Sequence, residues 1–268
     1  MNISGIPPLG LAHFTAIGVP PIELVGLAAR TGYASIGLRL YPAFPGAPFY
    51  EIPVGSAGSR EMRSRLSGEG ISVYDIEFVT IAADFVPVSL APMLEAASVL
   101  GAQRLSVCGD DPDHARMVST FAELCDLAAD FGMGVDLECM AWRQVASLPA
   151  AAAVAQEAAR PNGGVLVDAL HLSRTGGTPA DVRNTSASLI RSAQLCDAAA
   201  ERPASMDAII AEARSGRLPP GHGTLPLRDL LRALPDGTIL SVEVPMSGSA
   251  NPEAHVRTIF SATRALFD

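Results

Sequence analysis

The segment GVLVDALHLSRTGG, residues 164–177, joins a short apolar run to two side chains that can do chemistry. Its run of valine and leucine is typical of a buried strand, and Asp168 and His171 follow directly. A lone carboxylate at a strand end is often a helix cap or a salt-bridge partner, which is also the interpretation we favour for Asp197. For Asp168 we expect a metal ligand, and for His171, just beyond the strand, a substrate contact rather than a satisfied structural histidine.

Several other apolar segments carry polar side chains on one face. Because side chains alternate between the two faces of a strand, these polar residues share a face opposite their apolar neighbours. In the segment 72–80 the alternation sets Tyr74, Ile76 and Phe78 against the acids. The polar face that we expect to point inward comprises Asp75, Glu77, Asp136, Glu138, Asp168, Gln194 and Glu243.

Carboxylates that converge in this way repel one another. At about 4 Å and an effective dielectric near 20, each pair costs on the order of 4 kcal/mol. Some must therefore take up protons, or a cation must lie among them. We expect one divalent metal, with these ligands: Glu138, Asp168, Gln194 and Glu243. Three carboxylates and an amide oxygen form a hard ligand set, which favours Mn²⁺ or Mg²⁺ over a structural zinc site.

Further residues could anchor a substrate. Arg39 ends a predicted strand and could pair with a carboxylate or phosphate. The other candidates are Arg217, His222, Glu77 and His13, each weighed against a surface, loop-fixing or buried structural role. Phe44, Phe49 and Tyr50 could form an apolar wall over the substrate or only anchor their own loop.

Eight apolar segments are predicted to position these side chains as strands. They are residues 10–17, 33–40, 72–80, 103–109, 134–140, 164–170, 190–197 and 238–244. Helical patterns lie between most of them, at 21–33, 89–102, 113–132, 148–159 and 251–260, the last with Asn251 as N-cap and Pro252 at the first helical position. A strand and a helix repeated at about thirty-residue spacing predict a single (β/α)8 TIM barrel over residues 1–268, with a doubly wound sheet as the alternative.

Two connections, residues 41–59 and 198–226, are unusually long. Both follow strands and should therefore lie at the carboxyl-end face, where barrel enzymes keep their active sites. We interpret them as lids or substrate walls rather than decorative surface loops.

The composition narrows the classes of function. The net charge of −9 and the isoelectric point of about 5.0 argue against a nucleic-acid partner. No apolar stretch is long enough to span a bilayer, and the start of the chain lacks the order of a signal peptide, so we expect no membrane partner. The four cysteines are widely spaced without a CxxC motif, which predicts free thiols in a cytoplasmic protein.

Taken together, these motifs resemble the xylose isomerase-like barrel superfamily of sugar-phosphate isomerases and epimerases. The resemblance rests on GVDLE, VLVDALHL, AQLCD, PPGHGTLPL and SVEV, in this order, and covers nearly the whole chain. It implies that Glu138, Asp168, Gln194 and Glu243 bind one divalent metal and that His171 touches the substrate. The family's DNA-repair endonucleases need several more metal ligands, largely histidines, than the five histidines here supply.

Gln194 stands where the commonest family members carry histidine. Glutamine there, together with LECMAW and GRLPPGHG, is similar to a branch that includes 3-dehydroshikimate dehydratases. The strand-three sequence DIEFVTIAADF departs from the Phe/Arg-rich stretch of those dehydratases.

The resemblance implies proton abstraction beside a carbonyl, through a metal-stabilised enediolate, with Glu138 and Glu243 as the catalytic carboxylates. We therefore expect a sugar or sugar-phosphate isomerase or epimerase that acts on a small polyhydroxy carbonyl substrate. The alternatives are a dehydratase of a cyclic keto-acid such as 3-dehydroshikimate or of a keto-inositol, and a non-catalytic barrel. The apolar outer loops favour a homodimer.

Overall fold

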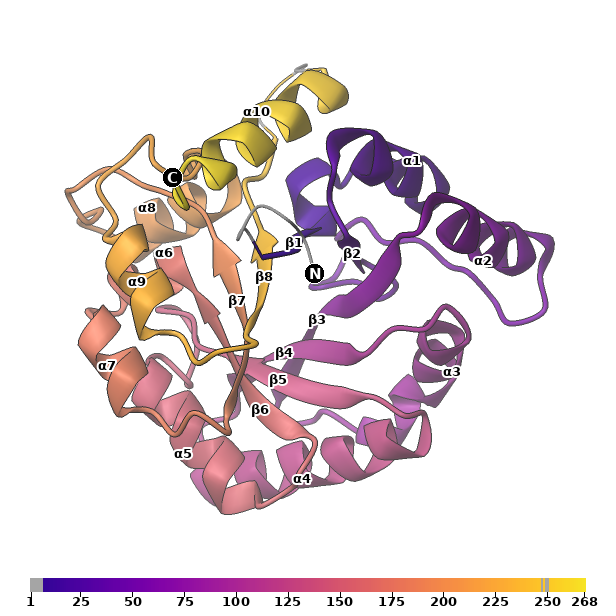
Figure 1. The fold of residues 1–268 in the computed structure, drawn as a ribbon. Helices are drawn as coiled ribbons and strands as arrows, with labels where there is room; N and C mark the ends of the chain where they lie inside the picture. Colours follow the sequence, from indigo (N-terminus) through magenta and orange to yellow (C-terminus); the bar gives the residue numbers. More distant parts are fainter. Residues whose placement is uncertain (1–6, 247, 249–250) are drawn as a thin grey trace.

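Eight parallel strands close into a barrel in the order of the sequence, β1 to β8 (Figure 1). The computed structural model describes residues 7–246, 248 and 251–268. The closed order confirms the predicted (β/α)8 barrel and excludes the doubly wound sheet, in which the first and last strands would not pair. Here β1 pairs with β8 through Leu9–Leu240 and Leu11–Val242.

The strands are β1 (Leu9–Leu11), β2 (Ser35–Leu38), β3 (Ser72–Ala82), β4 (Arg104–Asp110), β5 (Gly134–Glu138), β6 (Gly163–Asp168), β7 (Ile190–Leu195) and β8 (Ile239–Val242). The α-helices are α1 (Pro21–Thr31), α2 (Ala57–Glu69), α3 (Ala91–Val99), α4 (His114–Asp130), α5 (Leu148–Ala158), α6 (Ala169–Arg174), α7 (Pro179–Asn184), α8 (Met206–Ala211), α9 (Leu227–Ala233) and α10 (Pro252–Arg264). Two 3₁₀-helices, η1 (His13–Ala16) and η2 (Pro87–Leu90), and a π-helix, η3 (Glu212–Gly216), complete the order.

Side-chain caps mark where several helices begin. Asn251 accepts a hydrogen bond from the Ala254 N–H at 3.0 Å, as predicted for the start of α10, and Pro252 is its first residue. Asp168 does the same for α6, so one residue both ends β6 and starts the next helix. The long connection 198–226 contains α8 and η3, which its sequence did not predict.

The first predicted strand is too long. Residues 10–17 were expected to be extended, but β1 ends at Leu11 and η1 begins at His13. The backbone N–H groups of His13 and Phe14 donate to the carboxylate of Glu77, at 2.7 and 3.1 Å. These buried donors are satisfied by a side chain instead of a neighbouring strand, so the chain can turn there.

A bulge in β3 breaks the predicted alternation. Against β4, Ile76 pairs with Leu105 and Val79 with Val107, so three steps along β3 match two steps along its partner. The extra residue turns Phe78 toward the barrel end, where it lines a pocket. The prediction that Tyr74, Ile76 and Phe78 share one outward face is therefore wrong. Phe78 lines the pocket, and the Tyr74 hydroxyl donates to the Arg191 carbonyl of β7 across the barrel interior, at 3.4 Å.

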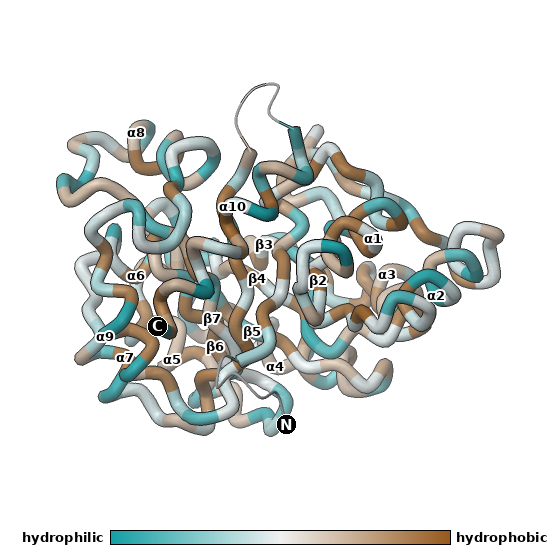
Figure 2. The backbone as a smooth tube through the Cα atoms, turned by 45° about the horizontal axis from the view of Figure 1, so that its top comes forward, coloured by the Kyte–Doolittle hydropathy of each residue, from teal (hydrophilic) through white to brown (hydrophobic). Residues whose placement is uncertain are grey.

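The barrel interior holds two groups of polar side chains. The amino-end cluster comprises Asp75, Arg104, Ser106, Asp136 and Ser192, and the carboxyl-end cluster comprises Glu138, Asp168, His171, Gln194, Arg217 and Glu243. Around them, apolar side chains of the strands pack against the helices, and Figure 2 shows hydrophobic stretches along the central strands with hydrophilic stretches on outer helices such as α2 and α9. Among the described residues, no helix combines the length and apolar character needed to cross a bilayer.

Candidate active site

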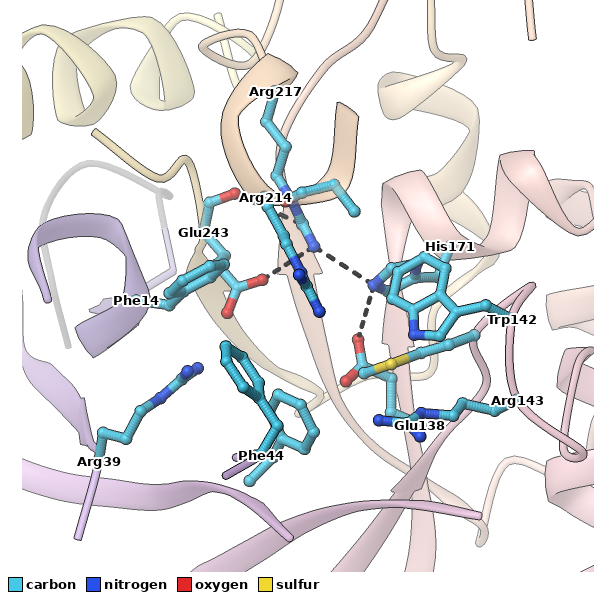
Figure 3. A pocket seen from close by; sticks show the side chains of 13 residues that line it. Phe14, Arg39, Phe44, Glu138, Trp142, Arg143, His171, Arg214, Arg217 and Glu243 are labelled. Atoms are coloured by element: carbon cyan, nitrogen blue, oxygen red, sulfur yellow. Dashed lines mark hydrogen bonds and ion pairs between the residues drawn. The ribbon is translucent and has the colours of Figure 1, made fainter. Parts of the chain in front are cut away.

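A pocket opens at the carboxyl ends of the strands and has about 530 Å³ of empty space, its open mouth included (Figure 3). Glu138, the last residue of β5, and Glu243, the residue after β8, both line it. His171, Arg217 and Arg39 line it as well. The structure thus gathers five of the predicted site residues around one cavity of the size that small-molecule ligands occupy.

Glu138 is buried in the pocket wall without a hydrogen-bond partner for its carboxylate among the described residues. Its nearest charged neighbour is the ring of His171, whose Nε2 lies 3.7 Å from Oε1. Burial, and then the negative charges of Asp168 and Glu243, raise the pKa of Glu138 well above its ordinary value. This carboxylate is therefore open to a cation or a proton.

Asp168 has both carboxylate oxygens engaged. Oδ1 accepts from the His171 N–H at 2.8 Å, and Oδ2 accepts from Nη1 of Arg217 at 2.5 Å. Burial opposes ionisation, but the charge of Arg217 and these hydrogen bonds outweigh it and lower the pKa of Asp168. Asp168 is the ionised member of the cluster.

His171 is a neutral imidazole at neutral pH. Burial lowers its pKa to about 4, despite the opposing effect of Asp168. Nδ1 has no hydrogen-bond partner in the described part of the chain, and the ring meets the edge of Trp142 with centroids 5.1 Å apart. A neutral imidazole can bind a metal or accept a hydrogen bond from a substrate.

Glu138, Asp168 and His171 form a buried group that could bind a metal ion. Each offers one ligand atom, and the three atoms lie within 4.8 Å of one another. The predicted ligand set shares Glu138 and Asp168 with this group but has Gln194 and Glu243 in place of His171. The structure brings all five side chains to the same end of the barrel.

Oε1 of Gln194 is completely buried and has no hydrogen-bond partner among the described residues. Gln194 lies on β7 directly beside Asp168 in the ladder between β6 and β7. A buried orphan oxygen costs free energy unless a ligand or a water satisfies it. Its place beside Asp168 fits the donor set of a divalent metal.

Arg217, which we expected to bind substrate, places a positive charge among the converging carboxylates. Nη1 pairs with Asp168, and Nη2 lies 2.9 Å from Oε2 of Glu243 and 3.4 Å from Nε2 of His171 (Figure 3). Burial raises the pKa of Glu243 to about 7, although Arg217 opposes that shift. A bound cation would favour the ionised form of all three carboxylates, Glu138, Asp168 and Glu243. The guanidinium of Arg217 would then leave two formal negative charges for a divalent ion to balance.

The backbone around Arg217 is held from both sides. Nε of Arg217 donates to the Ala213 carbonyl, within the π-helix η3, at 3.0 Å. The carboxylate of Asp197 accepts from the N–H groups of Gly221 and Leu225, both at 2.9 Å, and its backbone pairs with Leu218. Asp197 therefore has the structural role that we favoured for it, and this role fixes the loop that carries Arg217.

Glu77 and His13 do not line the pocket. Glu77 accepts the two N–H groups that end β1, and a Cβ at Gly37 would collide with its carboxylate. His13 accepts from the Arg39 N–H at Nδ1, 3.0 Å, and its Nε2 lies 3.0 Å from the Val19 carbonyl. Both side chains shape the backbone beneath Arg39 and have no free polar atom turned to a substrate.

Of the candidate residues in the two long loops, some line the pocket and others do not. His222 is exposed and lies outside the pocket lining, whereas Phe44 lies within it. Tyr50 stacks on His13 with centroids 5.2 Å apart and donates to the Ile17 carbonyl, so it anchors its own loop. Phe49 is exposed and lines a separate groove with Leu40.

The sequence did not predict several other lining residues. They are Phe14, Phe78, Met140, Trp142, Arg143, Ala213 and Arg214. One signal was present, because Trp142 is the only tryptophan of the chain and follows Glu138 by four residues. The others lie in loops, at the bulge, or in the short helices η1 and η3, where neither α-helical nor strand periodicity applies.

The sequence profile of the family described as xylose isomerase-like TIM barrel matches residues 25–266. The chain therefore belongs to this family, as the resemblance of its motifs indicated. A comparison with curated proteins found no significant match.

Solved structures with the same fold include several different proteins. The IolI protein, in a structure with a zinc atom bound, is 16% identical with a TM-score of 0.80 over 97% of this chain and 98% of its own. D-psicose 3-epimerase from Clostridium cellulolyticum, with D-tagatose, is 13% identical with a TM-score of 0.75 over 98% and 100%. The probable 3-DHS dehydratase AsbF from Bacillus anthracis is 16% identical with a TM-score of 0.74 over 96% and 99%. At these identities the likeness shows the fold alone.

Proposed function

We propose that this protein is a metal-dependent isomerase or epimerase that acts on a small polyhydroxy carbonyl compound. One observation carries the proposal: two buried carboxylates, Glu138 and Glu243, enter the same pocket from strands on different sides of the barrel (Figure 3). A substrate between them would present opposite faces of one carbon to two groups that can hold a proton. The epimerase among the similar structures supports the same class of reaction.

A divalent metal fits the carboxyl-end cluster. Glu138, Asp168, Gln194 and Glu243 would hold it, with His171 as a further candidate ligand. The residual charge of the cluster and the orphan oxygen of Gln194 support this assignment. The hard oxygen donors favour Mn²⁺ or Mg²⁺, whereas His171 and the zinc in the IolI structure favour a softer ion. When bound, such an ion polarises the oxygens of a carbonyl compound and so acidifies the neighbouring C–H.

The side chains of this chain then move the proton. One carboxylate removes the proton beside the carbonyl, and the other returns it to the opposite face, which inverts that carbon. Return to the neighbouring carbon gives isomerisation instead. Arg217 and His171 lie between the two carboxylates and can hold the substrate oxygens during the transfer.

Dehydration is the second candidate function, because loss of a hydroxyl after the same proton abstraction gives a lyase. Gln194 favours it, since glutamine at this position is similar to the dehydratase branch. The fold shared with the probable 3-DHS dehydratase AsbF is consistent with it. The strand-three sequence around Phe78 does not match that branch and favours a different substrate.

A side-by-side assay separates these functions. Metal-loaded protein is incubated in D₂O with a panel of ketoses and, separately, with 3-dehydroshikimate. An epimerase incorporates deuterium at the inverted carbon, whereas a dehydratase releases a conjugated product that absorbs in the ultraviolet. Epimerised product without deuterium would contradict the two-carboxylate proton transfer.

A variant separates both reactions from a non-catalytic barrel. In Glu243→Gln we expect turnover to fall while the circular dichroism spectrum and the thermal midpoint are retained. Glu253→Gln is the matched control and should keep full turnover, because this half-exposed side chain of α10 pairs with Arg30 and Arg257 and does not line the pocket. Undiminished turnover in Glu243→Gln would contradict the catalytic role of Glu243. No turnover in the natural protein, with ligand binding retained in Glu243→Gln, would favour the non-catalytic barrel.

A further inference from the structure

Arginines outnumber glutamates in the lining of the pocket. Four arginines line it, Arg39, Arg143, Arg214 and Arg217, against the two glutamates Glu138 and Glu243. Arg217 pairs with Asp168 and Glu243 of the carboxyl-end cluster. Arg143 pairs with Asp110 at 2.6 Å. The positive charges of Arg39 and Arg214 are less well balanced by nearby carboxylates.

Arg39 is the more unusual of the two because it is almost fully buried, with 2% of its surface exposed. Its only ion pair within the described part of the chain is a long one, 3.6 Å from Nη2 to Oε2 of Glu77. That carboxylate already accepts two backbone N–H groups. Nε of Arg39 has no hydrogen-bond partner in the described structure. A buried guanidinium with unmet donors carries a desolvation cost that an anionic ligand would remove.

The surroundings of Arg39 strengthen any such contact. Its Cζ lies 4.6 Å from the ring centroid of Phe14 and 5.4 Å from that of Phe78. The two rings hold the planar group in place and exclude water, so a charge pair formed there is less screened than one on the surface. The bulge in β3 is what brings Phe78 into this position.

Arg214 approaches the same pocket from the long connection after β7. Its guanidinium lies 4.9 Å from the ring centroid of Phe44, and no carboxylate of the described chain pairs with it. The side chain is exposed, so it can move toward a ligand at small cost. Figure 3 shows Arg39 and Arg214 reaching toward the pocket interior from different sides of it, with Phe44 between their approaches.

We propose that the substrate is an anion, and that Arg39 and Arg214 hold its carboxylate or phosphate group while the carbonyl end faces Glu138 and Glu243. Guanidinium groups pair with both kinds of anion through two parallel hydrogen bonds, which also fixes the orientation of the ligand. A neutral sugar would leave Arg39 with only its long ion pair to Glu77 among the described residues. This inference rests on the proposed function, because it assigns a substrate class to the same pocket.

Equilibrium binding to the metal-loaded protein tests the proposal without turnover. Calorimetry compares two matched pairs of probes: D-glucuronate with D-glucose, and D-fructose 6-phosphate with D-fructose. We expect the anionic member of at least one pair to bind tenfold or more tightly than its neutral partner. The pair that shows the larger preference identifies a carboxylate or a phosphate as the recognised group.

Variants connect that preference to the two arginines. Arg39→Gln and Arg214→Gln should each reduce the anion preference at least threefold while neutral-sugar binding changes less than twofold. Arg63→Gln, an exposed residue of α2, is the control and should keep the full preference. If Arg39→Gln does not fold, the preference of the Arg214→Gln protein decides between the two outcomes.

Equal binding of charged and neutral probes in both pairs would overturn the inference. A preference that survives in Arg214→Gln, and in a folded Arg39→Gln, would overturn it as well. Neither result would touch the proton-transfer proposal, which the deuterium assay tests separately. Conversely, an anion preference in a protein without any turnover would contradict the proposed function and leave the anion site standing.

Discussion

Two acids on the same strand show how differently the two ends of this barrel are built. Asp136 and Glu138 are two residues apart on β5, point into the barrel and are almost fully buried. Asp136 accepts from Arg104, and it accepts from the Ser192 hydroxyl at 3.1 Å. Glu138 accepts no hydrogen bond from the described residues and lies 3.7 Å from the ring of His171.

The same contrast recurs along the whole interior. In the amino-end cluster, Asp75 accepts from the Ser106 hydroxyl at 2.8 Å, so this cluster is closed by partners within the barrel. In the carboxyl-end cluster, Glu138 and the Oε1 of Gln194 are left open. Alternation alone places both sets inside the barrel. The presence or absence of an internal partner distinguishes a structural acid from one that is available to a ligand.

The largest expected effect is on turnover. Glu138→Gln removes a proton-carrying group from the pocket, so we expect kcat to fall by about 10²- to 10⁴-fold. The variant should be at least as stable as the natural protein, because it replaces a buried carboxyl group that has no hydrogen-bond partner among the described residues with a neutral amide of similar shape. Steady-state kinetics and thermal unfolding measure the two effects. A clear loss of stability with normal kcat would mean that Glu138 is a structural acid and not a catalytic one.

Removal of the buried acid at the amino end should lower stability and leave turnover nearly unchanged. Asp136→Ala leaves Arg104 without its carboxylate partner, and we expect a loss of about 3 kcal/mol in the free energy of unfolding. That figure lies at the low end for a broken buried pair because Arg104 is 13% exposed. Urea unfolding measures the loss, and the folded fraction should keep its kcat within a few-fold. A large fall in kcat without destabilisation would place Asp136 in the reaction.

Metal binding should also separate the two ends. A divalent ion at a hundred times its dissociation constant should stabilise the fold by about 2.7 kcal/mol. In Asp168→Ala we expect neither this gain in stability nor bound metal by elemental analysis. In Asp75→Asn we expect both to be retained. Equal loss in the two variants would mean that the ion does not bind at the carboxyl-end cluster.

The smallest effect is expected from single hydroxyls at the amino end. Ser192→Ala removes one hydrogen bond to Asp136, and Arg104 continues to compensate the carboxylate. We expect a loss of about 1 kcal/mol in the free energy of unfolding and no change in kcat or KM. Chemical denaturation is the measurement, and a loss above that of Asp136→Ala would mean that the hydroxyl, not the arginine, stabilises this acid.

The fold and the inward acids could be predicted because both follow from short-range periodicity. Strand spacing indicated all eight strands, and alternation placed Glu138, Asp168 and Glu243 at one end. The prediction for Phe78 is wrong because a bulge is set by pairing with β4, which alternation within β3 does not contain. The partners of Arg217 depend on η3 and on the hold of Asp197 on the following loop, contacts made across long stretches of sequence. No local pattern encodes such contacts.

The grip of Arg217 on Asp168 and Glu243 has a consequence for the segment 198–226. That guanidinium is one of the contacts that hold this long segment to the carboxyl end of the barrel. A metal ion or substrate that binds the same oxygens of Asp168 and Glu243 competes with Arg217 for them. Ligand binding in the pocket and release of the segment 198–226 are therefore coupled. An interaction that stabilises the attached segment must lower the affinity for such a ligand by the same factor by which the ligand weakens that interaction.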